Sequence, residues 1–300
     1  MSNSSNLVRM GTAANFFFAL VSLFPPCLTA QFGSAPALLP LTSITGITCL
    51  SGFSRVQSPS ISAWDTSWRA TAITVPSPFG LADLQSHRAM VSGKSNSWLG
   101  TTIALEAFGG SLYREFNGLA SVSTQISSLT SFGVSVAYSQ LTIASERSFS
   151  ALRFDIGATI LLPQRSRGSG AGGSGAGGSG TGGSGSRISI TMHNVLRSGI
   201  GTSTSSIPQD VAIAYGDAFD DDLEAEVQYR IVLQRSRSVQ CALSYRIASA
   251  VSFRCAADLS TTTLGMESAI NVTQSMRILS SVCFQPVLGL RIGGGVSWSL

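Results

Sequence analysis

The stretch ALRFDIGATI, residues 151–160, alternates between apolar residues and polar or small ones. Its even-numbered positions hold Leu, Phe, Ile, Ala and Ile, and its odd-numbered positions include Arg153, Asp155 and Thr159. A period of two is that of a β-strand, whose successive side chains point to opposite faces. A helix would instead repeat its apolar residues three and four positions apart. The stretch therefore predicts a strand with one apolar face and one charged face.

The same alternation recurs along most of the chain, for example in EVQYRIVLQ (226–234), VQCALSYRI (239–247) and LRIGGGVSWSL (290–300). Counting such segments predicts strands near 64–75, 84–91, 97–108, 117–126, 131–143, 150–162, 187–196, 209–216, 223–233, 238–247, 249–257, 264–271, 276–284 and 290–299. These are fourteen, and single-chain bacterial outer-membrane barrels have an even number of strands. The predicted fold class is all-β, a transmembrane antiparallel β-barrel of about 14 strands.

The composition agrees with a membrane protein. Of the 300 residues 44% are hydrophobic and only 11% are charged, whereas soluble domains carry roughly a quarter of charged residues. No segment after the N-terminal region has 18 consecutive apolar residues, the minimum for a membrane-spanning helix. The net charge of +4 comes from arginines that are scattered singly, so we predict no nucleic-acid partner.

The N-terminal residues predict export. Arg9 precedes an apolar run at 10–24, and residues 25–30 break the helix before a cleavage point after Ala30. We expect a signal peptide at 1–30, with an N-terminal anchor helix as the alternative. Residues 31–63 have no clear period and are expected to form an arm or plug, and 64–300 the barrel. The predicted location is the outer membrane.

A run of glycine and serine at 168–186 separates two groups of predicted strands. Such a run has no side chains able to build a core, and we expect a flexible coil. Neither group alone has enough strands to close a typical barrel, and closing a loop of this length costs about 3 kcal/mol. The run is therefore predicted to be a loop within one barrel.

Alternation also predicts which polar side chains face the interior of the barrel. The set is Arg153, Asp155, His193, Glu226, Gln228, Arg230, Arg246, Arg254, Glu267, Arg277 and Arg291. One interpretation is an ion-pair network that fills and stiffens the interior. The other is an arginine-rich constriction that selects anionic solutes, because the planar guanidinium binds both oxygens of a carboxylate.

The sequence lacks the short motifs that mark common nucleophile and metal sites. It has no G-x-S-x-G nucleophile motif, only two histidines, and no C-x-x-C pairing. We predict no catalytic, metal or cofactor site and no enzyme activity.

Several short motifs follow one another in a characteristic order: PSPFGLADL (76–84), FGGSLYREFNGLA (108–120), FDIGA (154–158), MHNVLRSGIG (192–201), IPQDVAIAYG (207–216) and FQPVLGLRIGGGVSWSL (284–300). Over residues 70–300 this succession resembles the PorV/PorQ-type outer-membrane proteins, relatives of the FadL long-chain fatty-acid transporters. The resemblance implies a fourteen-stranded barrel.

Three functions follow from these observations. The first is passive transport of small or hydrophobic solutes across the outer membrane, with the lipid bilayer and hydrophobic or anionic solutes as partners. The second, implied by the PorV resemblance, is a structural barrel that binds subunits of a type IX-like secretion machinery. The third is a secreted soluble β-sandwich adhesin.

Overall fold

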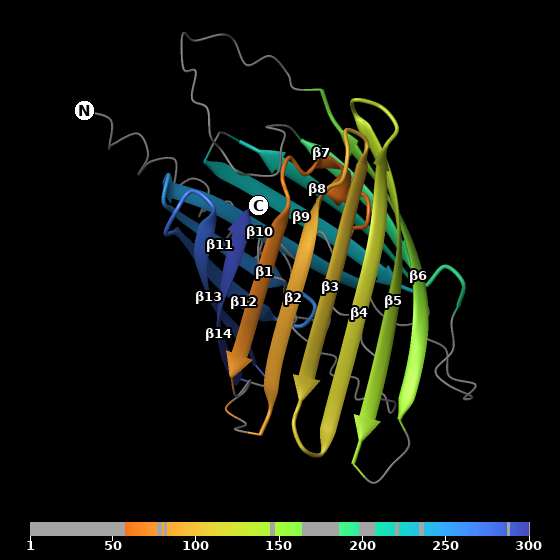
Figure 1. Ribbon diagram of the computed structural model, residues 1–300, viewed down its shortest axis with the longest axis vertical. Coiled ribbons are helices and arrows are strands. Elements are labelled where there is room, and N and C mark those ends of the chain that lie inside the picture. The colour runs from red at the N-terminus through yellow and green to blue at the C-terminus, as the bar shows by residue number, and fades with distance from the viewer. Residues whose placement is uncertain are drawn as a thin grey trace.

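The computed structural model describes residues 58–76, 80, 83–144, 148–163, 186–197, 208–219, 222–233, 237–286 and 289–299. These residues form fourteen strands and one short 3-10 helix, η1 (Ile61–Trp64) (Figure 1). The strands are β1 (Arg69–Pro76), β2 (Gln85–Lys94), β3 (Leu99–Gly109), β4 (Tyr113–Gln125), β5 (Thr130–Ile143), β6 (Phe149–Leu161), β7 (Arg187–His193), β8 (Asp210–Ala218), β9 (Leu223–Val232), β10 (Arg237–Ala248), β11 (Val251–Asp258), β12 (Thr263–Asn271), β13 (Met276–Gln285) and β14 (Gly289–Ser299).

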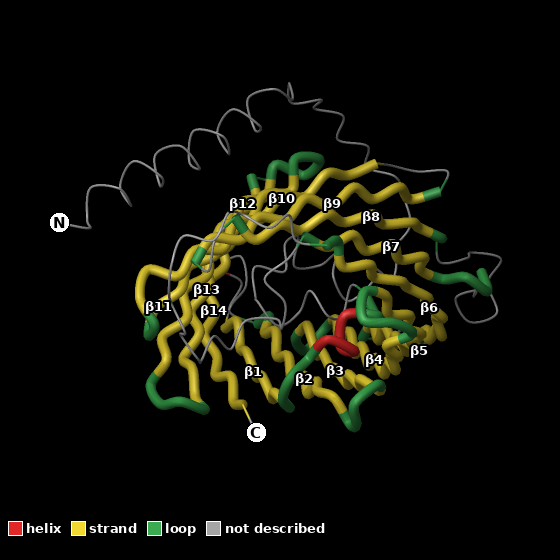
Figure 2. Tube along the Cα trace, turned by 90° about the horizontal axis from the view of Figure 1, so that it is seen from above, coloured by secondary structure: helices red, strands yellow, loops and turns green. Residues whose placement is uncertain are grey.

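The sheet closes on itself. Each strand pairs antiparallel with its neighbours in sequence, and β1 pairs with β14 from Arg69 opposite Ser299 to Thr74 opposite Gly294. Viewed from above, the strands form a ring (Figure 2). The predicted all-β barrel of fourteen strands is confirmed. The β-sandwich alternative is wrong, because a sandwich leaves sheet edges open whereas here the first and last strands are hydrogen-bonded.

In the described part of the chain, no helix has the length and apolar character needed to cross a bilayer.

The first strand begins later than predicted. Residues 64–68 were expected in a strand, but Trp64 ends η1 and β1 starts at Arg69. Here the alternation of the sequence was misleading, because η1 and the residues after it lead the chain into the wall.

The expected signal peptide (1–30), most of the expected arm (31–57) and the Gly/Ser run (168–185) lie outside the described residues. The strands on either side of that run, β6 and β7, pair directly from Ile156 opposite Met192 to Leu161 opposite Arg187.

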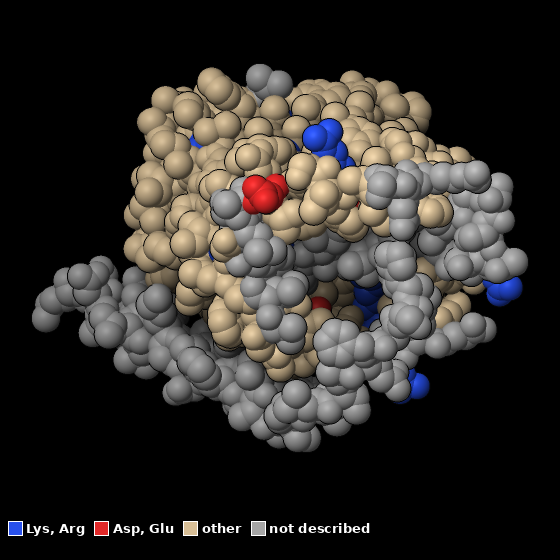
Figure 3. All heavy atoms as spheres, turned by 90° about the horizontal axis from the view of Figure 1, so that it is seen from below, with Lys and Arg blue, Asp and Glu red and all other residues tan. Residues whose placement is uncertain are grey.

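Apolar and polar residues that alternate in the sequence have side chains that are alternately exposed and buried in the strands. On β6, Leu152 and Ile160 are exposed while Arg153, Asp155 and Thr159 are buried. The exposed large hydrophobic side chains lie on nearly every strand. In the space-filling view from below, few charged atoms lie on the part of the outer surface that is seen, and some are visible inside the hollow (Figure 3). An apolar outer face is the architecture of a transmembrane barrel.

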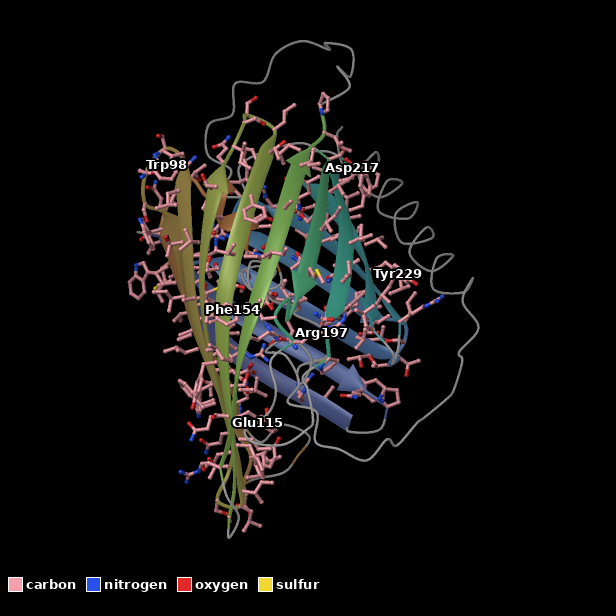
Figure 4. All side chains as sticks on the ribbon, turned by 90° about the vertical axis from the view of Figure 1, so that its right-hand side faces the viewer. Trp98, Glu115, Phe154, Arg197, Asp217 and Tyr229 are labelled. Carbon is pink, nitrogen blue, oxygen red and sulfur yellow. The ribbon has the colours of Figure 1, made fainter. Side chains whose placement is uncertain are left out.

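The two ends of the barrel differ in their connections. At the end where β1 begins and β14 ends, five of the six connections have four residues or fewer: 95–98, 126–129, 219–222, 249–250 and 272–275. The sixth, 162–186 between β6 and β7, is longer than any other connection of the barrel. At the other end, four connections are equally short (110–112, 233–236, 259–262 and 286–288), and those after β1 (77–84), β5 (144–148) and β7 (194–209) are longer. Figure 4 shows Trp98 and Glu115 near these opposite ends.

Candidate functional site on the inner wall

Charged side chains from β6 to β9 form a chain of ion pairs on the buried face. Arg153 Nε lies 2.9 Å from Asp155 Oδ1, and His193 Nδ1 lies 3.2 Å from Asp155 Oδ2. The other ring nitrogen of His193 is 3.8 Å from Asp210 Oδ1. Arg230 donates to both Asp210 oxygens, at 2.9 and 2.6 Å. Arg153 and Arg230, the two arginines among these ion pairs, thus each have a carboxylate partner, as burial of a charge requires.

The strand register explains why these residues meet. His193 and Asp210 are directly opposite on β7 and β8, and Asp155 is on β6, next to the end of β7. Asp155 also accepts from the backbone N–H of Asn194 at 3.0 Å and from Ser135 Oγ at 3.3 Å. Asn194, with a positive φ of 55°, turns the chain at the end of β7. Asp155 is therefore the carboxylate that connects β5, β6 and the end of β7. Asp210 is the second carboxylate of this group of ion pairs, and the alternation of the sequence did not predict it.

A second group joins β7 to β9 across β8. The two guanidinium Nη atoms of Arg187 lie 2.7 Å from Glu224 Oε1 and 2.7 Å from Glu226 Oε2. Gly216 stands between Arg187 and Glu226 in the register. A methyl group on Gly216 would lie 3.1 Å from the guanidinium carbon, so the glycine leaves the path across β8 open. Glu226 was predicted, whereas Arg187 and Glu224 were not.

A third group is centred on an ion pair, Arg88 with Glu106, that was not predicted. Arg88 on β2 donates to Glu106 Oε1 on β3 through Nε at 2.7 Å and Nη2 at 2.6 Å, and both side chains are buried. The predicted Arg291 on β14 is near enough to attract Glu106 electrostatically. The signal that could have found this pair was the alternation of Ser86, Arg88 and Met90 within QSHRAMVSGK.

The remaining predicted residues are distributed over β10 to β14. Arg254 and Glu267 are directly opposite on β11 and β12. Arg246 is partly exposed and lies 3.8 Å from Asp222 in the β8–β9 connection, and Arg277 is close enough to repel it. The predicted residues thus belong to several groups around the wall. The described residues contain no cluster of three or more side chains that could hold a metal ion.

An apolar arc lies on the same inner face. Its members are buried hydrophobic side chains from strands β12, β13 and β1 to β5: Ala269, Leu279, Ile73, Met90, Ala104, Leu119 and Ala137. Sequence reasoning missed this arc, because its members stand singly among polar inner residues, as Met90 does between Arg88 and Ser92. The inner wall therefore carries ion pairs on β6 to β9, and on β1 to β5 it combines the apolar arc with buried polar side chains such as Arg88, Glu106 and Ser123.

Residues Ser58–Asp65 run along the inner side of the wall, where Figure 2 shows η1 beside β3 and β4. Ser60 Oγ is 2.7 Å from Thr159 Oγ1, and Ser62 Oγ is 2.7 Å from Ser123 Oγ. The indole N–H of Trp64 donates to Ser131 Oγ at 2.8 Å. Wall hydroxyls on β4, β5 and β6 therefore hold this segment.

Glycines in the wall give the segment room. A methyl group on Gly133 would lie 2.4 Å from the Pro59 carbonyl oxygen, and one on Gly100 would lie 2.2 Å from that of Ser62. These distances are shorter than any ordinary contact, so the backbone of the segment approaches the wall as closely as only glycine allows.

No protein-family model matches the chain, and no curated protein matches it. Several solved structures match the chain in fold. The CymD monoaromatic hydrocarbon channel matches with a TM-score of 0.56 at 8% identity, over 85% of this chain and 94% of that chain. The Pseudomonas putida toluene transporter TodX matches with a TM-score of 0.55 at 7% identity, over 82% and 93%. A Pseudomonas aeruginosa FadL homologue matches with a TM-score of 0.48 at 9% identity, over 88% and 94%. At such identities the likeness concerns the fold alone, and the chain shares the barrel fold of monoaromatic hydrocarbon channels.

Proposed function

We propose that the protein is an outer-membrane barrel for passive transport of small or hydrophobic solutes. The observation that carries this proposal is the closed fourteen-stranded barrel with an apolar outer face, which matches the fold of known hydrocarbon channels. Two structures of similar fold, CymD and TodX, are described as a monoaromatic hydrocarbon channel and a toluene transporter.

The connections support an outer-membrane location. Outer-membrane barrels have short periplasmic turns and longer extracellular loops. The end where β1 begins is therefore proposed to face the periplasm, because five of its six connections have four residues or fewer and 162–186 is its one long connection. Export by the expected signal peptide at 1–30, with the lipid bilayer as partner, belongs to the same proposal.

For the charged inner residues we favour the structural interpretation over an anion-selecting constriction. Arg153 and Arg230 each contact a carboxylate, and Arg187 contacts two. An arginine whose donors are engaged has less to offer to a passing anion. The network is therefore assigned to holding β6 to β9 together.

The transport proposal is tested by swelling of proteoliposomes. Vesicles that contain the full chain should swell faster in isosmotic solutions of small neutral solutes than protein-free vesicles. A chain unfolded by boiling before reconstitution is the matched control. Equal rates with native and boiled chain would refute transport.

A non-transporting barrel that binds secretion subunits is the second candidate. It is favoured by the segment Ser58–Asp65, which occupies part of the interior and carries buried Ser60 and Ser62. The PorV/PorQ resemblance of the sequence supports the same role. Purification of the barrel with large secretion subunits from its native membrane, together with no swelling above control, would favour this candidate.

A further inference from the structure

A cavity of about 560 Å³ lies against strands β2 to β5, at the end of the barrel where the β3–β4 connection (110–112) turns the chain. Glu115, which also lines it, marks this end in Figure 4. The volume is within the roughly 300–1,000 Å³ range of ligand pockets. The cavity opens on the outer surface, because five of the strand residues that line it have exposed side chains: Gln85, His87, Ala107, Arg114 and Phe116.

The strand register explains why the outer surface is hollowed here. Two adjacent rows of outward-facing residues cross the four strands: His87, Ala107, Phe116 and Gln140 in one, and Gln85, Gly109, Arg114 and Thr142 in the other. In both rows β3 contributes the smallest residue. Ala107 and Gly109 therefore form the floor of the cavity, and the longer side chains of β2 and β4 stand on either side of it.

These two rows also mark the edge of an apolar belt on the outer face. The next two rows toward the middle of the barrel are apolar: Ala89, Leu105, Gly118 and Tyr138, then Val91, Ile103, Ala120 and Val136. Polar outward residues begin at one level on three strands, with His87 on β2, Arg114 on β4 and Gln140 on β5. Such a change marks the depth at which the hydrocarbon of a bilayer meets its headgroups. The cavity thus lies at headgroup depth.

Arg114 gives the cavity a positive charge with free donors. Its Nε donates to the carbonyl oxygen of Gly110 at 3.0 Å, and within the described part of the chain neither of its Nη groups has a partner. The planar guanidinium suits the oxygens of a phosphate, to which both Nη groups can donate. His87 Nε2 lies 3.2 Å from Gln85 Oε1, so the amide group of Gln85 remains as a further donor.

Two carboxylates also line the cavity. Glu115 is buried and accepts a hydrogen bond from Tyr113 Oη, so it is turned away from the outer surface. Asp83 is exposed and lowers the attraction of the cavity for an anion. Replacement of Asp83 by a neutral residue therefore gives a test of opposite sign to replacement of Arg114.

We propose that this cavity binds the phosphate headgroup of a membrane lipid, with Arg114 in contact with the phosphate oxygens. The acyl chains of the lipid extend over Phe116 and Leu105 into the apolar belt. A hydrocarbon would leave the donors of Arg114 unused, and a water-soluble phosphate would leave the belt unused. The site lies outside the barrel, so it does not depend on the passage of solutes, and a failed swelling assay leaves it standing.

The test compares dioleoylphosphatidic acid with dioleoylglycerol, which differ only by the phosphate group. The full chain in non-ionic detergent is titrated with each lipid, and the bound lipid is counted by native mass spectrometry. The native chain should bind the phosphate lipid about tenfold more tightly, as hydrogen bonds to a charged group allow. Equal affinities would overturn the proposal. Displacement of the phosphate lipid by an equal concentration of inorganic phosphate would overturn it too, because the acyl chains would then contribute nothing.

Arg114→Gln should lower the affinity for the phosphate lipid about tenfold and leave that for dioleoylglycerol unchanged. Arg197→Gln is the matched control, because it removes an exposed arginine from the β7–β8 connection at the same end, outside the cavity. Equal losses in the two variants would mean that net charge alone attracts the lipid, and would overturn the site. Asp83→Asn should raise the affinity about twofold, and a loss would contradict the proposal.

A second variant keeps the proposal testable should Arg114→Gln fail to fold. Ala107→Phe fills the floor of the cavity and should lower the affinity for the phosphate lipid about tenfold. Ala120→Phe is its control, since Ala120 is also exposed on the outer face but lies in the apolar belt, two rows away from Phe116. If Ala107→Phe and Ala120→Phe bind the lipid alike, the cavity is not its site.

Discussion

At the scale of single residues, Asp155 is the carboxylate that connects the inner side chains of β5, β6 and β7. Its carboxylate contacts Arg153 and His193 and accepts hydrogen bonds from Ser135 and from the backbone N–H of Asn194. These partners come from three strands and the turn after β7. Removal of one partner from a buried ion pair leaves an uncompensated charge and costs about 3–5 kcal/mol.

We expect Asp155→Asn to lower the free energy of unfolding by about 3 kcal/mol, because Arg153 would remain buried without its counter-charge. Urea unfolding of the barrel in detergent micelles, followed by tryptophan fluorescence, measures this loss. Asp222→Asn is the matched control, since Asp222 is exposed and 3.8 Å from Arg246, and its change should stay below about 1 kcal/mol. Similar losses in both variants would contradict the role given to Asp155.

At the scale of elements, the segment Ser58–Asp65 and the wall of β3 to β6 fit each other. Small residues make this fit: hydroxyls at Ser123, Ser131 and Thr159, and a glycine at 133 beneath Pro59. The segment is held by polar contacts over a short length, so a single methyl group in its path should dislodge it.

Gly133→Ala should therefore raise the swelling rate of proteoliposomes several-fold, because the added carbon would lie 2.4 Å from the Pro59 carbonyl oxygen and displace the segment. Gly118→Ala is the control, since its added carbon would make only an ordinary contact of 3.5 Å with Leu105. If the two variants conduct alike, the segment does not limit passage.

At the scale of the whole molecule, closure and the apolar outer face make one prediction each. A closed barrel leaves no sheet edge to fray, because β1 and β14 pair. Unboiled protein should therefore migrate on a denaturing gel as a compact species that boiling slows. Identical migration before and after boiling would be at odds with closure.

The outer face should tolerate charge at its rim and not at its middle. Val136→Arg, in the central part of β5, should cost about 2–4 kcal/mol in vesicle-refolded protein, because the arginine would face lipid. Leu112→Arg, in the exposed β3–β4 connection, should cost no more than about 1 kcal/mol. Equal costs at the two positions would mean that β5 does not face lipid at mid-wall.

The sequence by itself determined the strands, their number and, on strands such as β6, which residues turn inward. These are local properties, because the two-residue repeat of an extended backbone sends neighbouring side chains to opposite faces whatever the rest of the chain does. Arg153 and Asp155 could be assigned to the inner face for this reason.

Only the tertiary structure decided which inward residues meet. Asp155 and Asp210 are 55 positions apart in the chain, and their common contact with His193 depends on the pairing of β6, β7 and β8. Arg187 reaches Glu226 because a glycine stands between them, and Glu106 faces Asn117 because β3 and β4 are joined in one register. Register is set by hydrogen bonds between strands and by the lengths of their connections, and a shift of two residues would keep every face while changing every pair.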